Sequence, residues 1–164
     1  MFIGDQVLFS VPYLLNLNSL ILLSNLKVMI KKAKASWYGN GLEGHGMMST
    51  ESDLLNDVKY TSKSRFEGAP GGSPEELIAA AHAACFSMKL SFNLSEHDFP
   101  PAKLDVQCAI KMENFVINQS RLVVKAEVPG IDQETFNDLV EDARLNCPIS
   151  KLLDVSIVVE ASLS

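Results

Sequence analysis

The segment from residue 73 to residue 94, SPEELIAAAHAACFSMKLSFNL, constrains the fold of this chain more than any other feature. It predicts a long helix that is apolar nearly all round, apart from His82, Lys89 and a few serines. A helix of this kind is buried on most of its sides. In a chain of 164 residues we therefore expect either a helix at the centre of the domain or one that a second subunit covers.

The start of this helix has a signature of its own. Ser73 is expected to be the N-cap, and Pro74 takes the first helical position, where its missing N–H costs nothing. Glu76, at the third position, completes a capping box. The ten residues 65–74, RFEGAPGGSP, contain three glycines and two prolines and predict a loop before the helix.

The rest of the chain predicts short strands and two further helices. Two alternating segments form a hairpin whose turn is expected near residues 118–119. Asp132 is expected to cap one helix, and Pro148 suits the first position of a short one. This order of elements makes the fold class α+β. The expected strands are 29–39, 46–52, 56–62, 104–113, 121–130 and 155–163, and the expected helices are 73–94, 133–146 and 149–153.

The first 28 residues differ from those that follow. They are apolar with almost no charge, so we expect an extension, residues 1–28, before a single domain, residues 29–164. The extension lacks the basic leader and the cleavage signature of a signal peptide. Since no uninterrupted apolar run reaches the roughly 20 residues of a membrane span, no membrane partner is expected. Two explanations stay open: a helix from about Tyr13 to Met29 packed on the domain, or a start upstream of the usual initiator, Met29.

Charge and cysteine content narrow the class of function. The formal net charge of −6 does not favour nucleic acid, because proteins that bind nucleic acid usually carry a basic face. The three cysteines, an odd number, do not resemble the disulfide framework of a secreted protein. We therefore expect a reducing compartment and a cytoplasmic location.

Cys85, within the long helix, has two explanations. A free cysteine is among the most buried residue types and can be a small core hydrophobe. The alternative depends on Cys147, expected at the N-cap of the short helix, where free N–H groups and the helix dipole stabilise a thiolate. The two thiols could then form a pair in which one is oxidised to sulfenic acid and the other closes a disulfide. Cys108 lies on the apolar face of a predicted strand and is expected in the core.

Other polar residues also leave alternatives open. His82 lies three residues before Cys85 on the same face of the helix. It has three possible roles: a packed residue, a partner of a thiolate or a metal ligand. A zinc site needs three or four closely spaced ligands, and there is no C-x-x-C here, so no metal is expected. Arg65 is either a surface side chain or a cation beside a thiolate. The glycine-rich loop lacks the phosphate-binding pattern G-x-x-x-x-G-K-[ST], and no cofactor is expected.

Four motifs, RFEG, GGSPEELIAAAHAACFSM, PGID and NCPISKLL, occur in this order. Their order and spacing resemble the OsmC/Ohr family, and most closely its OsmC branch of osmotically inducible, hydroperoxide-reducing proteins. The resemblance covers residues 29–164. It implies an OsmC-like fold, with antiparallel sheets around a long central helix, and an intertwined homodimer with two active sites at its interface.

The resemblance also implies a function. It gives Cys85 the role of peroxidatic cysteine, Cys147 that of resolving cysteine, Arg65 that of the thiolate-stabilising arginine and Glu75 that of the acid that orients this arginine. The implied activity is the reduction of organic hydroperoxides to alcohols in oxidative and osmotic stress defence, with a lipoyl-type dithiol as reductant. Ser73 stands before the proline at a position where many family members have asparagine, and serine can also serve as the N-cap of the helix. The alternative is a non-catalytic dimeric module that binds a small apolar ligand and whose cysteines are inert.

Spacing along the long helix adds a constraint on assembly. Glu75 and Cys85 are ten residues apart, an axial rise of about 15 Å. If both serve one thiol through Arg65, Glu75 comes from the partner subunit of a homodimer with composite sites. An apolar pocket beside the thiol would favour organic hydroperoxides over hydrogen peroxide. The candidates to line it are Phe66, Phe86, Met88 and Phe92.

Overall fold

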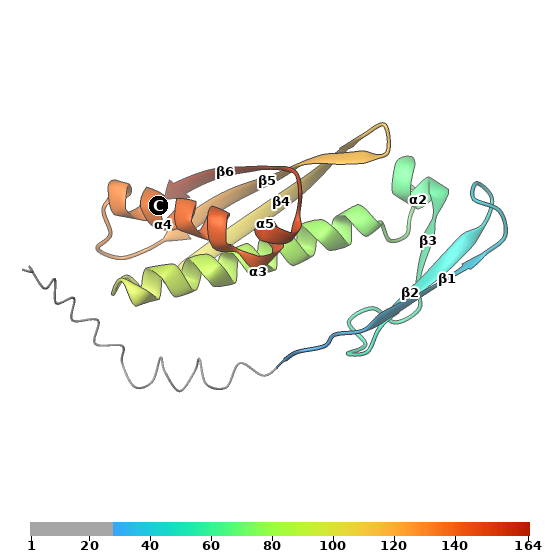
Figure 1. Ribbon diagram of the computed structural model, residues 1–164, viewed down its shortest axis with the longest axis horizontal. Helices are drawn as coiled ribbons and strands as arrows, with labels where there is room; N and C mark the ends of the chain where they lie inside the picture. The colour runs from blue at the N-terminus through green and yellow to red at the C-terminus, as the bar shows by residue number, and fades with distance from the viewer. Residues whose placement is uncertain (1–27) are drawn as a thin grey trace, which may run out of the picture.

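The structure is a computed structural model that describes residues 28–164 of the chain (Figure 1). Residues 1–27 lie outside the described residues, and with them nearly all of the predicted extension and its candidate helix. Residues 28–32 have no regular structure. The predicted boundary between residues 1–28 and a domain at 29–164 therefore stays a prediction.

The described part of the chain contains two three-stranded sheets and four helices. The first sheet has the strand order β1-β2-β3 and is antiparallel, and the second has the order β4-β5-β6. The elements are β1 (Ala33–Tyr38), β2 (His45–Thr50), β3 (Val58–Thr61), α2 (Ser62–Phe66), α3 (Pro74–Glu96), β4 (Lys103–Glu113), β5 (Val116–Glu127), α4 (Gln133–Asn146), α5 (Pro148–Leu152) and β6 (Ser156–Leu163). The predicted α+β class is confirmed.

The second sheet corrects the expectation that both sheets are antiparallel. β4 and β5 pair antiparallel, but β6 pairs parallel to β5, with Leu122 opposite Val159. The reason is the connection, because α4 and α5 carry the chain back to the same end of the sheet before β6 begins. Parallel neighbours require a crossover of this kind, whereas antiparallel ones need only a tight turn.

The hairpin of β4 and β5 follows the predicted alternation. Along β4, every second residue from Leu104 to Ile110 is partly buried, and Cys108 is among them, whereas the residues between them are exposed. The turn is not near residues 118–119 as expected. It lies at Asn114 and Phe115, which have φ values of 51° and 64°. Two consecutive residues with positive φ form the tight turn whose twist matches a two-residue hairpin.

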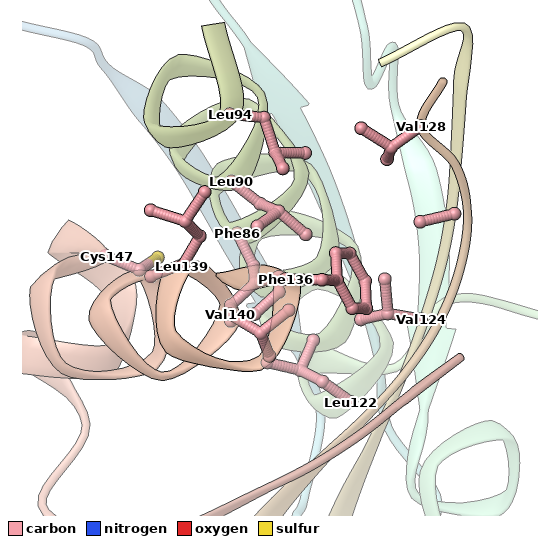
Figure 2. Close-up of a cluster of buried hydrophobic side chains, with 12 residues drawn as sticks. Phe86, Leu90, Leu94, Leu122, Val124, Val128, Phe136, Leu139, Val140 and Cys147 are labelled. Carbon is pink, nitrogen blue, oxygen red and sulfur yellow. The ribbon is translucent and has the colours of Figure 1, made fainter. Parts of the chain in front are cut away.

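The hydrophobic core lies between α3, α4 and the second sheet (Figure 2). By length and composition alone α3 could cross a membrane, but here one of its faces packs on β4 and α4 as a core helix does. The buried cluster comprises Phe86, Leu90, Leu94, Leu122, Val124, Ala126, Val128, Phe136, Leu139, Val140, Ala143 and Cys147.

The long helix is buried along one face only, and not on most sides as its sequence predicts. Leu77, Met88 and Phe92 of α3 are exposed. The first sheet does not cover them, since it projects away from the core (Figure 1), and within the described residues its main contacts outside itself are with α2. Every residue of β1 is exposed as well.

We expect Phe136→Ala to lower the free energy of unfolding by about 3–5 kcal/mol, because the ring is fully buried and its removal leaves a cavity between α4 and the sheet. Phe115→Ala serves as the control, since that ring is 82% exposed at the hairpin tip. The Phe115→Ala substitution should lower the free energy of unfolding by about 1 kcal/mol at most. Chemical denaturation at one protein concentration measures both, and equal losses would contradict this description of the core.

Candidate active site

The first of two candidate clusters is an arginine–glutamate pair at the start of α3. Arg65, on α2, donates from Nη2 to Glu75 Oε1 at 2.6 Å and from Nε to the two carboxylate oxygens at 3.1 and 3.2 Å. Both residues belong to the same chain. The guanidinium therefore has a fixed plane, which is what two nearly parallel hydrogen bonds to a carboxylate provide.

Neighbouring groups hold this pair in place. Ser73 is the N-cap of α3 and Pro74 its first residue, as predicted, but the capping box with Glu76 is not formed. Instead the Ser73 hydroxyl donates to Glu75 Oε2 at 2.8 Å. The hydrogen bond from Arg65 is the main reason why the pKa of Glu75 is lowered, and the bond to Glu75 raises the pKa of Arg65. Both groups stay charged at neutral pH.

The loop before α3 packs closely against α2. Gly71 has a φ of 140°, and a Cβ on it would lie 2.9 Å from the Cβ of Ser64. Ser64 in turn donates to the carbonyl of Gly72 at 3.0 Å. Glycine at position 71 thus lets α2 approach the start of α3, and with it Arg65 approaches Glu75.

The second cluster is a pair of thiols. Cys85 is partly buried in the middle of α3, and Cys147 is fully buried at the N-cap of α5, as its position before Pro148 predicts. Cys85 packs against the buried cluster that contains Cys147, and the Cys147 thiol and the backbone N–H of Ile149 both act on the pKa of the Cys85 thiol. The two cysteines that the sequence could not bring together are therefore neighbours.

Burial raises the pKa of the Cys85 thiol. The Ile149 N–H opposes this rise, and the neighbouring Cys147 adds to it. Among residues 28–164 no cationic side chain acts on this sulfur. The thiol is consequently protonated at neutral pH in the single chain, whereas reaction with an electrophile needs the thiolate.

The structure does not bring the two clusters together within one chain. Glu75 lies in the first turn of α3 and Cys85 ten residues later on the same helix, about 15 Å along the axis. The four candidate residues are thus present as two separate clusters, with Arg65 and Glu75 in one and Cys85 and Cys147 in the other.

His82 is a packed residue and not a partner of the Cys85 thiol. Its ring is fully buried, with Nδ1 2.7 Å from the Ser120 hydroxyl and Nε2 2.9 Å from the Ser150 hydroxyl. Cys108 contacts the same Ser120 at 3.3 Å. Within the described chain, no three His, Cys, Asp or Glu side chains are grouped to hold a metal ion.

We expect the protein to lose stability as the pH falls below about 6.5, since burial lowers the pKa of His82. Above that pH the ring is neutral in both states. Below it the unfolded state binds the proton more readily, and unfolding becomes easier by up to about 1.4 kcal/mol per pH unit. His82→Gln should flatten this slope between pH 7 and pH 5, whereas His45→Gln, at an exposed position on β2, should keep it. Unfolding curves at constant protein concentration test this, and an unchanged slope in His82→Gln would contradict it.

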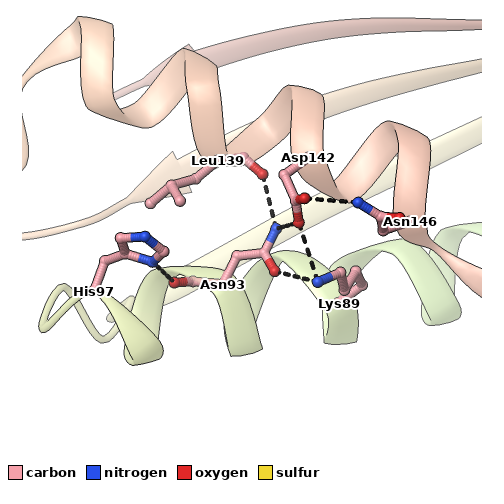
Figure 3. A network of polar contacts seen from close by, with 6 residues as sticks. All are labelled: Lys89, Asn93, His97, Leu139, Asp142 and Asn146. Carbon is pink, nitrogen blue, oxygen red and sulfur yellow. Dashed lines mark hydrogen bonds and ion pairs between the residues drawn. The ribbon is translucent and has the colours of Figure 1, made fainter. Parts of the chain in front are cut away.

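A polar network joins α3 to α4 (Figure 3). Asn93 donates to the carbonyl of Leu139 at 2.9 Å and to Asp142 at 2.8 Å, and Lys89 forms an ion pair with Asp142 at 3.1 Å. Asn146 donates to the same carboxylate at 2.7 Å. Since Asn146 directly precedes Cys147, this network fixes the end of α4 from which Cys147 follows.

Sequence reasoning missed several of these residues. Ser120, Ser150 and Asn93 are buried and hydrogen-bonded, but a single serine or asparagine in an apolar segment carries no distinct signal. The four candidates for an apolar pocket do not share one. Phe86 is fully buried in the core, which corrects that expectation. Phe66 lines a hollow of about 110 Å³ beside Arg65, while Met88 and Phe92 line an open hollow of about 500 Å³ on the exposed face of α3.

Comparisons with known proteins agree with the motifs and the fold. The family described as OsmC-like protein matches residues 66–162. The chain is 42% identical over 137 residues to peroxiredoxin OsmC of Escherichia coli strain K12, covering 81% of this chain and 96% of that one. It is 27% identical over 128 residues to the organic hydroperoxide resistance protein of Xanthomonas axonopodis pv. citri, covering 76% and 88%.

Solved structures show the same fold. The organic hydroperoxide resistance protein OhrB of Bacillus subtilis has a TM-score of 0.55 at 23% identity, covering 81% of this chain and 98% of that one. An organic hydroperoxide resistance protein OsmC from Legionella pneumophila has a TM-score of 0.57 at 22% identity, covering 84% and 98%. Motifs, fold and relatives together place the chain in the OsmC/Ohr family.

Proposed function

We propose that this protein is a cysteine-based peroxidase that reduces organic hydroperoxides to alcohols in defence against oxidative and osmotic stress. The observation that carries the proposal is that Cys85 packs against the buried cluster that contains Cys147, whose thiol acts on the pKa of Cys85. It occurs in a chain whose relatives are named peroxiredoxin and organic hydroperoxide resistance protein. A second thiol near the attacking one can capture the sulfenic acid as a disulfide, which an external thiol can then reduce.

The reaction has three steps. The Cys85 thiolate attacks the terminal oxygen of the hydroperoxide, the O–O bond breaks, and the alkoxide takes a proton to leave as the alcohol. Cys85 is then a sulfenic acid, and the Cys147 sulfur attacks it, which forms the disulfide and releases water. An external dithiol reduces the disulfide by thiol–disulfide exchange and leaves as its own disulfide.

Access to solvent supports this division of roles. Cys85 is partly exposed, so a hydroperoxide can reach it, while Cys147 is fully buried behind it. A buried thiol next to the attacking one is protected from the oxidant and still within reach of the sulfenic acid. Cys147 therefore suits the resolving role better than the peroxidatic one.

Within residues 28–164 no cationic side chain acts on the Cys85 sulfur, and this supports a dimer with composite sites. Burial raises the pKa of Cys85, and a guanidinium beside the sulfur would lower it again. Arg65 of the same chain is held by Glu75 at the far end of the helix. In our proposal, Arg65 of the partner subunit, oriented by the partner's Glu75, approaches Cys85. A guanidinium has enough donors to contact its glutamate, the sulfur and the peroxide oxygen.

Uncovered apolar surface supports the same assembly. Trp37 and Tyr38 of β1 and Met88 and Phe92 of α3 are exposed in the single chain. Exposed apolar areas of this kind usually mark an interface. An intertwined homodimer would cover β1 and α3 at once, because the projecting first sheet of each chain can pack on the α3 of the other.

The proposal also covers the substrate, the reductant and the location. The hollow beside Arg65 is lined in part by the rings of Trp37, Tyr60 and Phe66, which suits an alkyl or aryl tail better than hydrogen peroxide. The family resemblance suggests a lipoyl-type dithiol as the reductant. A cycle that passes through free thiols suits the cytoplasm, where disulfides are kept reduced.

The test is hydroperoxide consumption by the full chain with dihydrolipoamide as reductant. We expect faster turnover of cumene hydroperoxide than of hydrogen peroxide at matched concentration. Equal rates with the two oxidants would contradict the apolar substrate site. No turnover with either dihydrolipoamide or dithiothreitol would reject the peroxidase and leave a non-catalytic dimeric module that binds an apolar ligand.

A further inference from the structure

The buried ring of His82 ties three elements together, and the reaction proposed above does not use it. It lies on α3, one turn before Cys85, and contacts Ser120 on β5 at 2.7 Å and Ser150 on α5 at 2.9 Å. Both hydroxyls are buried, and the ring is fully buried. Since burial lowers the pKa of His82, the ring is neutral at physiological pH, with one nitrogen donating and the other accepting.

The contact with Ser150 matters because of what α5 carries. This helix has only five residues, and its exposed Leu152 adds little to its packing. Yet α5 begins directly after Cys147, and its Ile149 N–H is placed to donate to the Cys85 sulfur. Ser150 follows Ile149, so the hydrogen bond from His82 is anchored one residue from the group that faces the reactive sulfur.

A second anchor lies on the other side of Cys147. Asn146 contacts Asp142, which is held by Lys89 and Asn93 of α3 (Figure 3). The joint between α4 and α5 is thus tied to α3 one turn before Cys85, through His82, and one turn after it, through Lys89. Cys147 lies between these two ties.

We propose that His82 is a positioning residue which, through Ser150, holds α5 so that the Ile149 N–H faces the Cys85 sulfur and Cys147 can attack the Cys85 sulfenic acid. This inference rests on the proposed peroxidase function. If α5 moves away, the sulfenic acid still forms, but its capture by Cys147 is slower. A second hydroperoxide then oxidises the waiting sulfenic acid to sulfinic acid and is itself reduced to the alcohol.

The test compares two substitutions, each of which removes one of the two hydroxyl groups that contact the His82 ring. His82→Ala would leave a cavity in the core and two unpaired hydroxyls, so the full-length protein is changed at the hydroxyls instead. Ser150→Ala removes the tie to α5, and Ser120→Ala removes the tie to β5 and leaves α5 in place. Because each variant deprives His82 of one hydrogen bond, their losses of stability should be similar.

The reduced proteins are mixed with a small excess of cumene hydroperoxide, and disulfide, sulfenic acid and sulfinic acid are followed by mass spectrometry. We expect Ser150→Ala to close the disulfide about tenfold more slowly than wild type and to accumulate sulfinic acid, since small displacements of reacting groups have large effects on rate. Ser120→Ala should stay within about twofold of wild type. Alkylation of Cys85 as a function of pH should shift to higher pH in Ser150→Ala alone.

Each other outcome overturns the inference. Wild-type rates in Ser150→Ala would show that α5 needs no tie to His82. Equal slowing in both variants would show a general effect of the core and no specific role for α5. Failure of the wild type to form sulfenic acid would instead reject the peroxidase function, and this inference with it. The wild-type measurement therefore distinguishes failure of this inference from failure of the proposed function.

Discussion

We expect Cys85→Ser to abolish the reduction of organic hydroperoxides, with a loss in turnover of at least about 10³-fold. The serine hydroxyl is close in size to the thiol, so the packing of α3 is kept, but it is not ionised at neutral pH and is a poor nucleophile. Cys147 is not expected to replace it as the attacking thiol, because Cys147 is fully buried. The measurement is cumene hydroperoxide consumption under saturating dithiol.

Two further variants serve as controls. Cys108→Ser changes a partly buried thiol on β4 that contacts only Ser120 among the polar side chains of residues 28–164, and it should keep turnover near that of wild type. In the absence of added dithiol, Cys147→Ser should consume about one equivalent of hydroperoxide as Cys85 becomes a sulfenic acid, and further hydroperoxide should overoxidise it. Equal loss in Cys85→Ser and Cys108→Ser would point to damaged structure, and full activity in Cys85→Ser would reject Cys85 as the attacking thiol.

The second large effect is expected at Arg65. If the guanidinium stabilises the Cys85 thiolate and polarises the peroxide, Arg65→Met should slow the reaction at pH 7 by about 10²- to 10³-fold. The sign of the pH effect follows from the charge. A nearby cation lowers the pKa of a thiol, so its removal raises the pKa, and the pH profile of Cys85 alkylation moves to higher pH. Arg65→Lys keeps the charge without the forked geometry and should recover part of the rate.

Arg121→Met is the matched control for this variant. Arg121 also forms a 2.6 Å ion pair with a glutamate, Glu160, and likewise bonds it through Nε and Nη2. It lies on the exposed side of the second sheet between β5 and β6. Its loss should leave both the rate and the pH profile near those of wild type. If both variants behave alike, Arg65 is an ordinary surface ion pair.

Local signals in the sequence were sufficient for much of the fold. Asp132 caps α4 by accepting from the N–H of Thr135 at 2.9 Å, and Pro148 begins α5, because both effects depend on neighbouring residues only. The apolar face of β4 follows directly from alternation. The direction of β6 was not predictable in this way. It depends on where α4 and α5 place the chain, which is a matter of tertiary packing.

The start of α3 shows how tertiary contacts override a local motif. Ser73 and Glu76 have the spacing of a capping box, but the Ser73 hydroxyl donates to Glu75. The reason is that Arg65 fixes the Glu75 carboxylate beside it. The short helix α2 was not predicted, because it has only five residues. Its capping box also lacks the usual sequence signature, since Thr61 pairs with Ser64 and not with a glutamate or glutamine.

The candidate site was predictable residue by residue but not as an arrangement. The motifs pointed to Cys85, Cys147, Arg65 and Glu75, and helix geometry already separated Glu75 from Cys85. That Cys147 lies near Cys85, and that His82 reaches α5, depends on contacts between residues 62 and 68 positions apart in sequence. Sequence periodicity carries no information about such contacts.

The most direct test of the central claim is a mixed dimer of Arg65→Met and Cys85→Ser chains. The two variants are co-expressed with different affinity tags, and the heterodimer is purified through both. If sites are composite, one of its two sites combines an intact Cys85 with an intact Arg65 from the other chain. The heterodimer should then show about half of the wild-type rate per dimer with cumene hydroperoxide, although both parent homodimers are nearly inactive. A heterodimer as inactive as its parents would mean that each chain builds its site alone, and would contradict the account.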